Sequence, residues 1–259
     1  MLRARGEKAF IGFVTAGDPD AATTVTVVRA LADAGVDAVE IGLPFSDPLA
    51  DGPSIQASSQ RALDGGMTTA KALDVVAEIR AACPTLPLIL MTYFNPIRYY
   101  GLERYARDAK AKGADAHIVT DLTPEEAADW KRISVANGLD TVFLLAPTST
   151  PIRIEVVSAL STGFVYCVSR TGVTGARQDI PAELTAVVGR IKAQTSTPVC
   201  VGFGVSSPEH VRHICTFADG AVVGSALVNL IHEQRDAEDL AQQVYDFASS
   251  LKSGTRPQS

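Results

Sequence analysis

The chain has 259 residues, of which 46% are hydrophobic and 20% charged, so it can bury a large core and is too apolar to be an intrinsically disordered protein. Its formal net charge of -6 argues against a nucleic-acid or anionic-membrane partner. The four cysteines are widely spaced, with no CxxC pair, and are expected to be reduced packing residues. The sequence has neither an export signal nor an apolar stretch long enough to span a membrane, which predicts a soluble cytoplasmic protein.

Short β-rich apolar runs alternate with amphipathic stretches along the chain, the pattern of parallel βα units. The eight predicted strands are residues 9–15, 38–43, 86–92, 116–120, 141–146, 163–169, 198–203 and 220–224. The eight predicted helices between and after them are residues 21–34, 69–82, 102–112, 124–136, 152–160, 182–194, 208–217 and 237–250.

Capping residues agree with these boundaries. Thr123 and Ser207 precede helix-starting prolines, and Gly35, Gly113 and Gly138 follow helix ends. Eight βα units predict a single-domain (β/α)8 TIM barrel over residues 1–252, followed by a polar, frayed tail over residues 253–259. A doubly wound open sheet is the alternative, because it produces much of the same pattern.

The second predicted strand and the loop after it carry two candidate catalytic carboxylates. Alternation along the strand turns Glu40 toward the barrel interior, where an apolar environment favours its protonated form and allows it to act as acid and then as base. A buried salt bridge is the alternative role of this residue. Asp51 follows eleven positions later on the same rim, while Asp47, in a Ser-Asp-Pro turn, is equally well explained as a turn residue.

The ends of the last three strands carry the other candidate groups. Tyr166 faces inward by alternation, and the polar loop after it, with Arg170 and Thr174, is suited to close over a substrate. The segments VGFG, ending at Gly204, and VGSA, containing Gly224 and Ser225, offer backbone N–H groups to a phosphate. His210 and His213 have no third ligand nearby in the sequence, so no metal site is predicted.

Four segments together resemble the tryptophan synthase alpha chain family. They are GFVTAGDP (12–19), EIGLPFSDPLADGP (40–53), SRTGVTG (169–175) and GFG (202–204). The resemblance extends from about residue 10 to residue 230 and includes MTYFNP (91–96) and APTS (146–149). It implies a TIM barrel that cleaves indole-3-glycerol phosphate to indole and glyceraldehyde 3-phosphate by a retro-aldol reaction without a cofactor of its own.

The resemblance also implies roles for individual residues. Glu40 matches the general acid and base, Asp51 the carboxylate at the indole N–H, and Tyr166 an active-site tyrosine. Thr174 matches the threonine of the closing loop, with Arg170 in the same loop and Thr15 nearby. The implied substrate-binding residues are Phe13, Met91, Ile118 and Phe203 around indole, Thr174 in the closing loop, and Gly175, Gly204, Gly224 and Ser225 around phosphate.

The implied partner is a pyridoxal-phosphate-containing tryptophan synthase β subunit in an α2β2 complex, to which indole is passed. Asp47, Pro48, Asn95 and Pro96 match loops on the face toward that partner. The chain departs from the family in two places. The segment before the first strand is short, so we expect a different closure of the barrel bottom. TDLT (120–123) replaces the usual PDLP on the side expected to face the partner, so the departure bears on docking affinity.

Three other functions remain open from the sequence. One is a stand-alone indole-3-glycerol phosphate lyase that releases free indole, and another is a catalytically weak subunit that activates a β enzyme. The third is a different phosphate-binding barrel enzyme, an isomerase or an aldolase.

Overall fold

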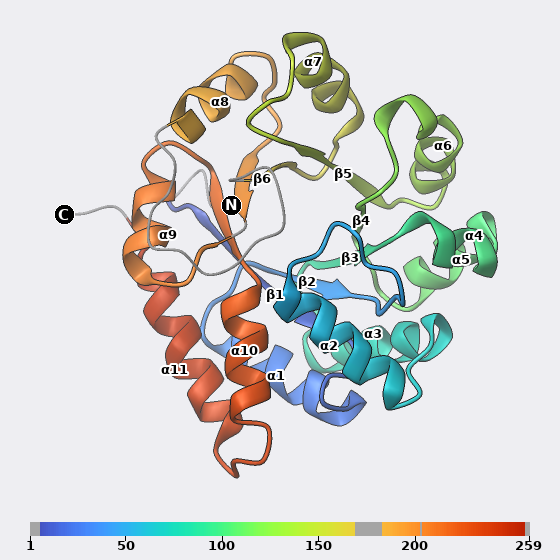
Figure 1. The fold of residues 1–259 in the computed structure, drawn as a ribbon, viewed down its shortest axis with the longest axis vertical. Helices are drawn as coiled ribbons and strands as arrows, with labels where there is room; N and C mark the ends of the chain where they lie inside the picture. Colours follow the sequence, from blue (N-terminus) through green and yellow to red (C-terminus); the bar gives the residue numbers. More distant parts are fainter. Residues whose placement is uncertain (1–5, 169–182, 203, 257–259) are drawn as a thin grey trace.

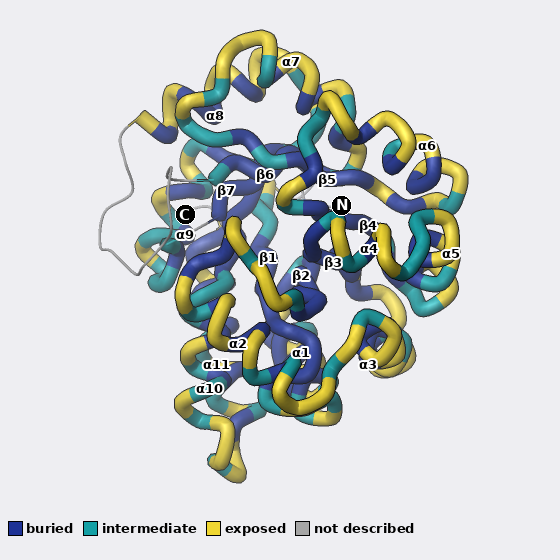
Figure 2. Tube along the Cα trace, turned by 45° about the vertical axis from the view of Figure 1, so that its right-hand side comes forward, coloured by how far each residue is buried: buried dark blue, intermediate teal, exposed yellow. Residues whose placement is uncertain are grey.

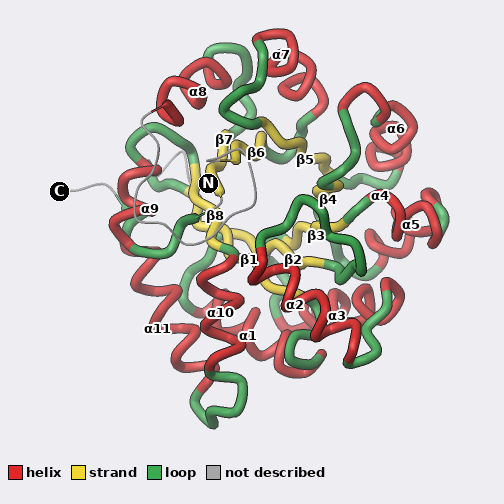
Figure 3. Tube along the Cα trace, in the orientation of Figure 1, coloured by secondary structure: helices red, strands yellow, loops and turns green. Residues whose placement is uncertain are grey.

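The computed structural model describes residues 6–168, 183–202 and 204–256. Its eight strands form one closed parallel barrel in sequence order, and the helices lie around it (Figures 1 and 3). The strands span Ala9–Thr15 (β1), Ala38–Gly42 (β2), Leu88–Thr92 (β3), Ala116–Val119 (β4), Asp140–Leu145 (β5), Val165–Val168 (β6), Val199–Gly202 (β7) and Gly220–Val223 (β8). The predicted (β/α)8 barrel is therefore confirmed, and the open-sheet alternative was wrong.

The eight predicted helices are present with small shifts of their ends. They are Ala21–Asp33 (α1), Thr69–Ala82 (α3), Leu102–Ala111 (α5), Ala128–Ala136 (α6), Pro151–Leu160 (α7), Glu183–Lys192 (α8), Pro208–Cys215 (α9) and Leu240–Ser253 (α11). Ser207 caps α9 as expected, accepting the N–H of His210 at 3.3 Å. Thr123 instead donates to the Glu126 carboxylate at 3.2 Å, and the predicted helix begins there as a short 3-10 turn before α6.

The helices Pro53–Asp64 (α2), Phe94–Tyr100 (α4) and Ser225–Glu233 (α10) were not predicted. The buried face of α2 consists of Ile55, Ser58, Ser59 and Ala62, so it has no continuous apolar stripe to show in the sequence. The seven-residue α4 is too short for a recognisable period. The nine-residue α10 follows β8 directly, and α11, expected in that place, packs against α1.

The chain end is more ordered than expected over its first residues. Ser253 is the last residue of α11, and Thr255 is buried, with its carbonyl accepting the N–H of Lys8 at 3.3 Å. Gly254 and Thr255 are thus buried near the start of β1, while Ser253 and Arg256 are exposed. Residues 257–259 lie outside the described residues.

Alternation along the strands separates two apolar layers. The strands are buried except at a few of their residues, whereas the helices expose their outer faces (Figure 2). On β2, Val39 and Ile41 belong to the layer between strands and helices, while Ala38 belongs to the layer inside the barrel. The inward orientation predicted for Glu40, which lines a cavity at the barrel's interior, is therefore confirmed.

A repeated hydrogen-bond pair joins the amino ends of neighbouring strands. Asp37, just before β2, donates its N–H to the carbonyl of Phe10 at 2.9 Å and accepts the N–H of Phe10 on its carboxylate at 2.7 Å. The same reciprocal pair recurs before β4, β6 and β8, as Asp115 with Leu88, Thr162 with Thr141, and Asp219 with Val199. These pairs stabilise the end of the barrel opposite the loops that follow the strands.

No helix in the described part of the chain is both long and apolar enough to cross a membrane.

Candidate active site

A small cavity lies inside the carboxyl-terminal end of the barrel, at the end where active sites of this fold occur. Its free volume is about 20 Å³. It brings together predicted residues from β1, β2, β3, β6 and the chain around β7 and β8: Phe13, Glu40, Met91, Tyr166, Gly204, Gly224 and Ser225, together with Ile55 and Val222, which were not predicted. Residues far apart in the sequence thus meet because the eight strands end on one rim.

The Glu40 carboxyl group is fully buried in this cavity. Its Oε1 atom has no hydrogen-bond partner among the described residues. Burial raises the pKa of Glu40 from 4.5 to about 8, because the ionised form is desolvated. Among the described residues no ion pair holds its carboxylate, and burial is the one cause of the pKa shift. Glu40 is a proton-carrying acid at neutral pH.

Asp51 lies at the end of the loop between β2 and α2 and is also buried. Burial raises its pKa to about 6, although the hydroxyl of Tyr93 opposes this shift by favouring the ionised form. At neutral pH Asp51 is therefore mainly ionised while Glu40 is mainly protonated. Two carboxyl groups with different protonation states can serve as proton donor and as electrostatic stabiliser.

Tyr93 is a functional candidate that the sequence analysis missed, although it lies in a segment that carried the resemblance. Its ring is 4% exposed and packs on Phe45 with centroids 5.3 Å apart. Its hydroxyl accepts the N–H of Ala50 at 3.0 Å. The position directly after β3 was the available signal, because parallel strand ends share one rim.

Two glycines make room for the aromatic rings of the site. A Cβ atom on Gly42 would lie 2.5 Å from the Phe13 ring, and one on Gly202 would overlap the Tyr166 hydroxyl. This close approach of the rings was not predicted for either glycine, although Gly202 lies in the VGFG segment expected at the phosphate. Tyr166 itself is buried, and its pKa is raised first by burial and then by the charges of Glu40, Cys200 and Asp51.

Gly224 and Ser225 lie at the N-terminus of α10, which opens onto the cavity. Gly224 precedes the helix and Ser225 is its first residue, so unpaired N–H groups of the first turn face this end of the barrel. The dipole of the helix adds partial positive charge at the same point. This arrangement can bind a phosphate group without a lysine.

The remaining predicted residues lie near the cavity or outside the described residues. Ile118 is buried in the inner layer opposite Met91. Thr15 is bonded to Ser58 of α2 at 2.7 Å. Asp47 and Asn95 are exposed and Pro48 and Pro96 half-buried, in the β2–α2 loop and α4. Arg170, Thr174, Gly175 and Phe203 lie outside the described residues.

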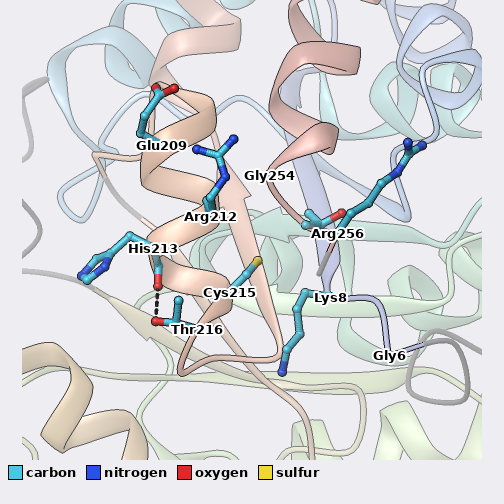
Figure 4. Close-up of a pocket in the computed structure, with 10 residues that line it drawn as sticks. Gly6, Lys8, Glu209, Arg212, His213, Cys215, Thr216, Gly254 and Arg256 are labelled. Carbon is cyan, nitrogen blue, oxygen red and sulfur yellow. Dashed lines mark hydrogen bonds between the residues drawn. The ribbon is translucent and has the colours of Figure 1, made fainter. Parts of the chain in front are cut away.

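A much larger cavity, of about 600 Å³, lies at the opposite end of the barrel. It is formed by α9, the end of α11 and the residues before β1 (Figure 4). Lys8, Arg212 and Arg256 contribute positive charge, but their charged ends point in different directions (Figure 4). Its lining includes no predicted site residue, so the size of a cavity does not locate this active site.

Comparison with known proteins agrees with the geometry. The family model "Tryptophan synthase alpha chain" matches residues 1–256. The tryptophan synthase alpha chain of Geobacter sulfurreducens is 48% identical over 251 residues, covering 97% of this chain and 94% of its own. That of Geobacter sp. strain M21 is 50% identical over 253 residues, covering 98% and 94%.

Solved structures show the same similarity. The tryptophan synthase subunit alpha of Legionella pneumophila aligns with a TM-score of 0.91 and 37% identity, over 98% of this chain and 95% of that one. A chain of Mycobacterium tuberculosis tryptophan synthase aligns with a TM-score of 0.90 and 39% identity, over 99% and 96%. The chain therefore belongs to the tryptophan synthase alpha chain family and is a lyase of tryptophan biosynthesis.

Proposed function

We propose that this chain cleaves indole-3-glycerol phosphate to indole and glyceraldehyde 3-phosphate, with Glu40 and Asp51 as the catalytic carboxyl groups. The observation that carries the proposal is the pair of buried carboxyl groups whose pKa values are separated, at about 8 and about 6. They lie at the barrel end where a helix N-terminus is available for the phosphate. Acid, stabilising anion and phosphate site are the three parts that this reaction requires.

In the proposed reaction, protonated Glu40 first gives its proton to C3 of the indole ring. The ring becomes positively charged, and ionised Asp51 beside the indole N–H stabilises that charge. The Glu40 carboxylate then takes the proton from the hydroxyl on the adjacent glyceryl carbon. As the C–C bond breaks, its electron pair returns to the indole ring and the hydroxyl carbon becomes the aldehyde. Glu40 ends protonated, as it began, and no net proton is consumed.

The other residues hold the two ends of the substrate. Phe13, Met91 and Ile118 form an apolar surface suited to the indole ring. The backbone N–H groups at Gly204, Gly224 and Ser225 are suited to the phosphate. Tyr166 lines the same cavity as Glu40, where its ring is suited to shield the buried acid from water. Fixing both ends of the substrate places its C3 and hydroxyl against one carboxyl group.

We further propose a tryptophan synthase β subunit as the partner, receiving the indole in an α2β2 complex. Similarity to a chain of M. tuberculosis tryptophan synthase supports this proposal. Leu49 is 88% exposed and Tyr99 is 96% exposed, beside Asp47, Pro48, Asn95 and Pro96. Large exposed apolar side chains on one rim are suited to a protein interface. The stand-alone lyase has no such need for them.

The test is indole release from indole-3-glycerol phosphate by the purified chain, alone and with saturating β subunit. Slow release that β strongly stimulates supports the partnered lyase, whereas fast unaided release supports the stand-alone enzyme. The Glu40→Gln variant, assayed in parallel, measures the background. Absence of release above that background in both conditions contradicts the proposal and leaves the activating subunit or a different substrate.

A further inference from the structure

Helix α2 and the residues just before it place Asp51 and Ile55 at the site. Asp51 is two residues before its first residue, and the Gln56 side chain of its first turn donates to the Asp51 carbonyl at 2.8 Å. Ile55, from the same turn, lines the site cavity. Any displacement of α2 along or away from the barrel therefore moves Asp51 relative to Glu40.

The helix has little hydrophobic burial to hold it in place. Only Ile55 and Ala62 are apolar among its buried residues, and the other two are Ser58 and Ser59. By contrast, α3 buries Ala72, Leu73, Val75, Val76 and Ile79. Because apolar burial is the main force that seats a surface helix on a barrel, α2 depends more than its neighbour on polar contacts.

Those polar contacts reach the end of β1 and the loop after it. Ser58 donates to the Ile55 carbonyl at 2.8 Å, so the Thr15 hydroxyl, 2.7 Å away, is the donor to Ser58. One turn later, Arg61 forms two parallel hydrogen bonds to Asp18, at 2.8 Å from Nε and 2.7 Å from Nη2. The Asp18 side chain is 4% exposed. This is a fork geometry that fixes distance and orientation together.

We propose that Arg61 and Asp18 are positioning residues for the lyase reaction. Their ion pair holds α2 on the β1–α1 loop, so that Asp51 keeps its position relative to Glu40. The inference rests on the role proposed above for Asp51. It assigns a function to a pair that does not line the site cavity and was not identified in the sequence. Thr15 joins the same attachment through Ser58.

The first test measures kcat and KM for Arg61→Met in the full chain with saturating β subunit. We expect kcat to fall about ten- to a hundredfold, with KM changed less than about threefold, because misplacement by about 1 Å has effects of that size. Arg61→Lys keeps the charge without the fork and is expected to recover part of kcat. If Arg61→Met does not fold, Arg61→Lys and Asp18→Asn provide the same measurement.

The matched control is Arg80→Met. Arg80, whose side chain is about as buried as that of Arg61, pairs at 2.6 Å with the more exposed Asp115 at the other end of the barrel. Its removal is expected to lower the melting temperature as Arg61→Met does and to leave kcat unchanged. Equal losses of kcat in both variants, in proportion to their stability, would overturn the inference, because the pair would then be only structural.

A second readout comes from the pH dependence of kcat/KM. Displacement of α2 in Arg61→Met exposes Asp51 to water, which relieves its desolvation, so the acid limb is expected to move to lower pH. Wild-type kcat with an unmoved acid limb in a folded Arg61→Met protein contradicts the positioning role.

The Asp51→Asn variant separates this inference from the proposed function. Full activity in Asp51→Asn contradicts the role of Asp51 itself. An inactive Asp51→Asn together with a fully active Arg61→Met contradicts only the positioning role of Arg61 and Asp18.

Discussion

The Tyr93 hydroxyl accepts the backbone N–H of Ala50 at 3.0 Å, which ties the residue after β3 to the loop that ends in Asp51. The same hydroxyl favours the ionised form of the Asp51 carboxyl group. One side chain thus restrains the loop backbone and adjusts the charge of the acid that follows it. This arrangement leads to the first prediction.

Tyr93→Phe removes the acceptor of the Ala50 N–H and the hydroxyl beside Asp51 while keeping the ring on Phe45. We expect kcat to fall about tenfold and the acid limb of the pH profile to move to higher pH, because the ionised form of Asp51 loses support. Steady-state kinetics between pH 5 and pH 9 measure both effects. Tyr245→Phe, on α11, is the matched control, and an acid limb that stays in place in Tyr93→Phe contradicts this role.

The wild-type pH profile is the second prediction. The proposed reaction begins with Asp51 ionised and Glu40 protonated, and their pKa values are about 6 and about 8. We therefore expect kcat/KM to form a bell with limbs near these values, falling below the first as Asp51 gains a proton and above the second as Glu40 loses one. Melting temperatures recorded across the range exclude unfolding as the cause. A rate that stays constant from pH 5 to pH 9 is the contrary outcome.

Glu40→Gln provides the third prediction. Loss of the titrating group at nearly constant size should lower kcat about 10²- to 10⁴-fold. At high pH, by contrast, the variant should be more stable than the wild type. The folded-state pKa of Glu40 lies above its ordinary value of 4.5, so the unfolding free energy of the wild type falls by up to about 1.4 kcal/mol per pH unit between about pH 4.5 and about pH 8. A glutamine side chain does not ionise, so the unfolding free energy of the variant does not fall in this way.

Urea unfolding at pH 4 and at pH 8 separates the two effects of Glu40→Gln. The variant and the wild type should be equally stable at pH 4, and the variant should be the more stable at pH 8. A variant that is less stable than the wild type at pH 8 would mean that the carboxyl group is not penalised by burial.

Gly202→Ala is the fourth prediction. The added Cβ would overlap the Tyr166 hydroxyl, so the ring must move, and Tyr166 lines the same cavity as Glu40. We expect kcat/KM to fall at least about tenfold, since core overpacking forces such displacements. Gly189→Ala, where a Cβ meets nothing within 4 Å, is the control and should be neutral or slightly stabilising. Unchanged kcat/KM in Gly202→Ala would show that Tyr166 can move without cost.

His117 gives a prediction about acid stability away from the site. It is buried between Tyr105 and Trp130, with ring centroids 5.2 Å and 5.3 Å away, and burial lowers its pKa to about 3. Below pH 6.5 the unfolded chain binds a proton that the folded chain rejects, so the wild type loses up to about 1.4 kcal/mol of stability per pH unit as the pH falls from 6.5 toward 3. His117→Leu should remove this component.

Thermal unfolding of both proteins at pH 4.5 and pH 7.5 measures the effect of His117→Leu. Relative to the wild type, the variant should be more stable at pH 4.5 than it is at pH 7.5. An equal difference at both values contradicts the prediction, because the histidine would then not titrate on unfolding.

The barrel and the two candidate carboxylates could be predicted from the sequence alone. Strand and helix periods are local properties of the chain, so all eight strands could be predicted within a few residues. The inward direction of Glu40 followed from the two-residue repeat of β2, and Asp51 became a candidate through its place after that strand. The segments that resemble the tryptophan synthase alpha chain family carried the remaining assignments.

The contacts that hold these groups in place could not be predicted, because they form between residues far apart in the chain. Tyr93 and Ala50 are 43 positions apart in the chain, as are Asp18 and Arg61, and no local pattern connects either pair. The buried face of α2 is half serine, which concealed both the helix and its attachment. The separation of the pKa values of Glu40 and Asp51 likewise depends on burial, which exists only once the eight strands close around the two carboxyl groups.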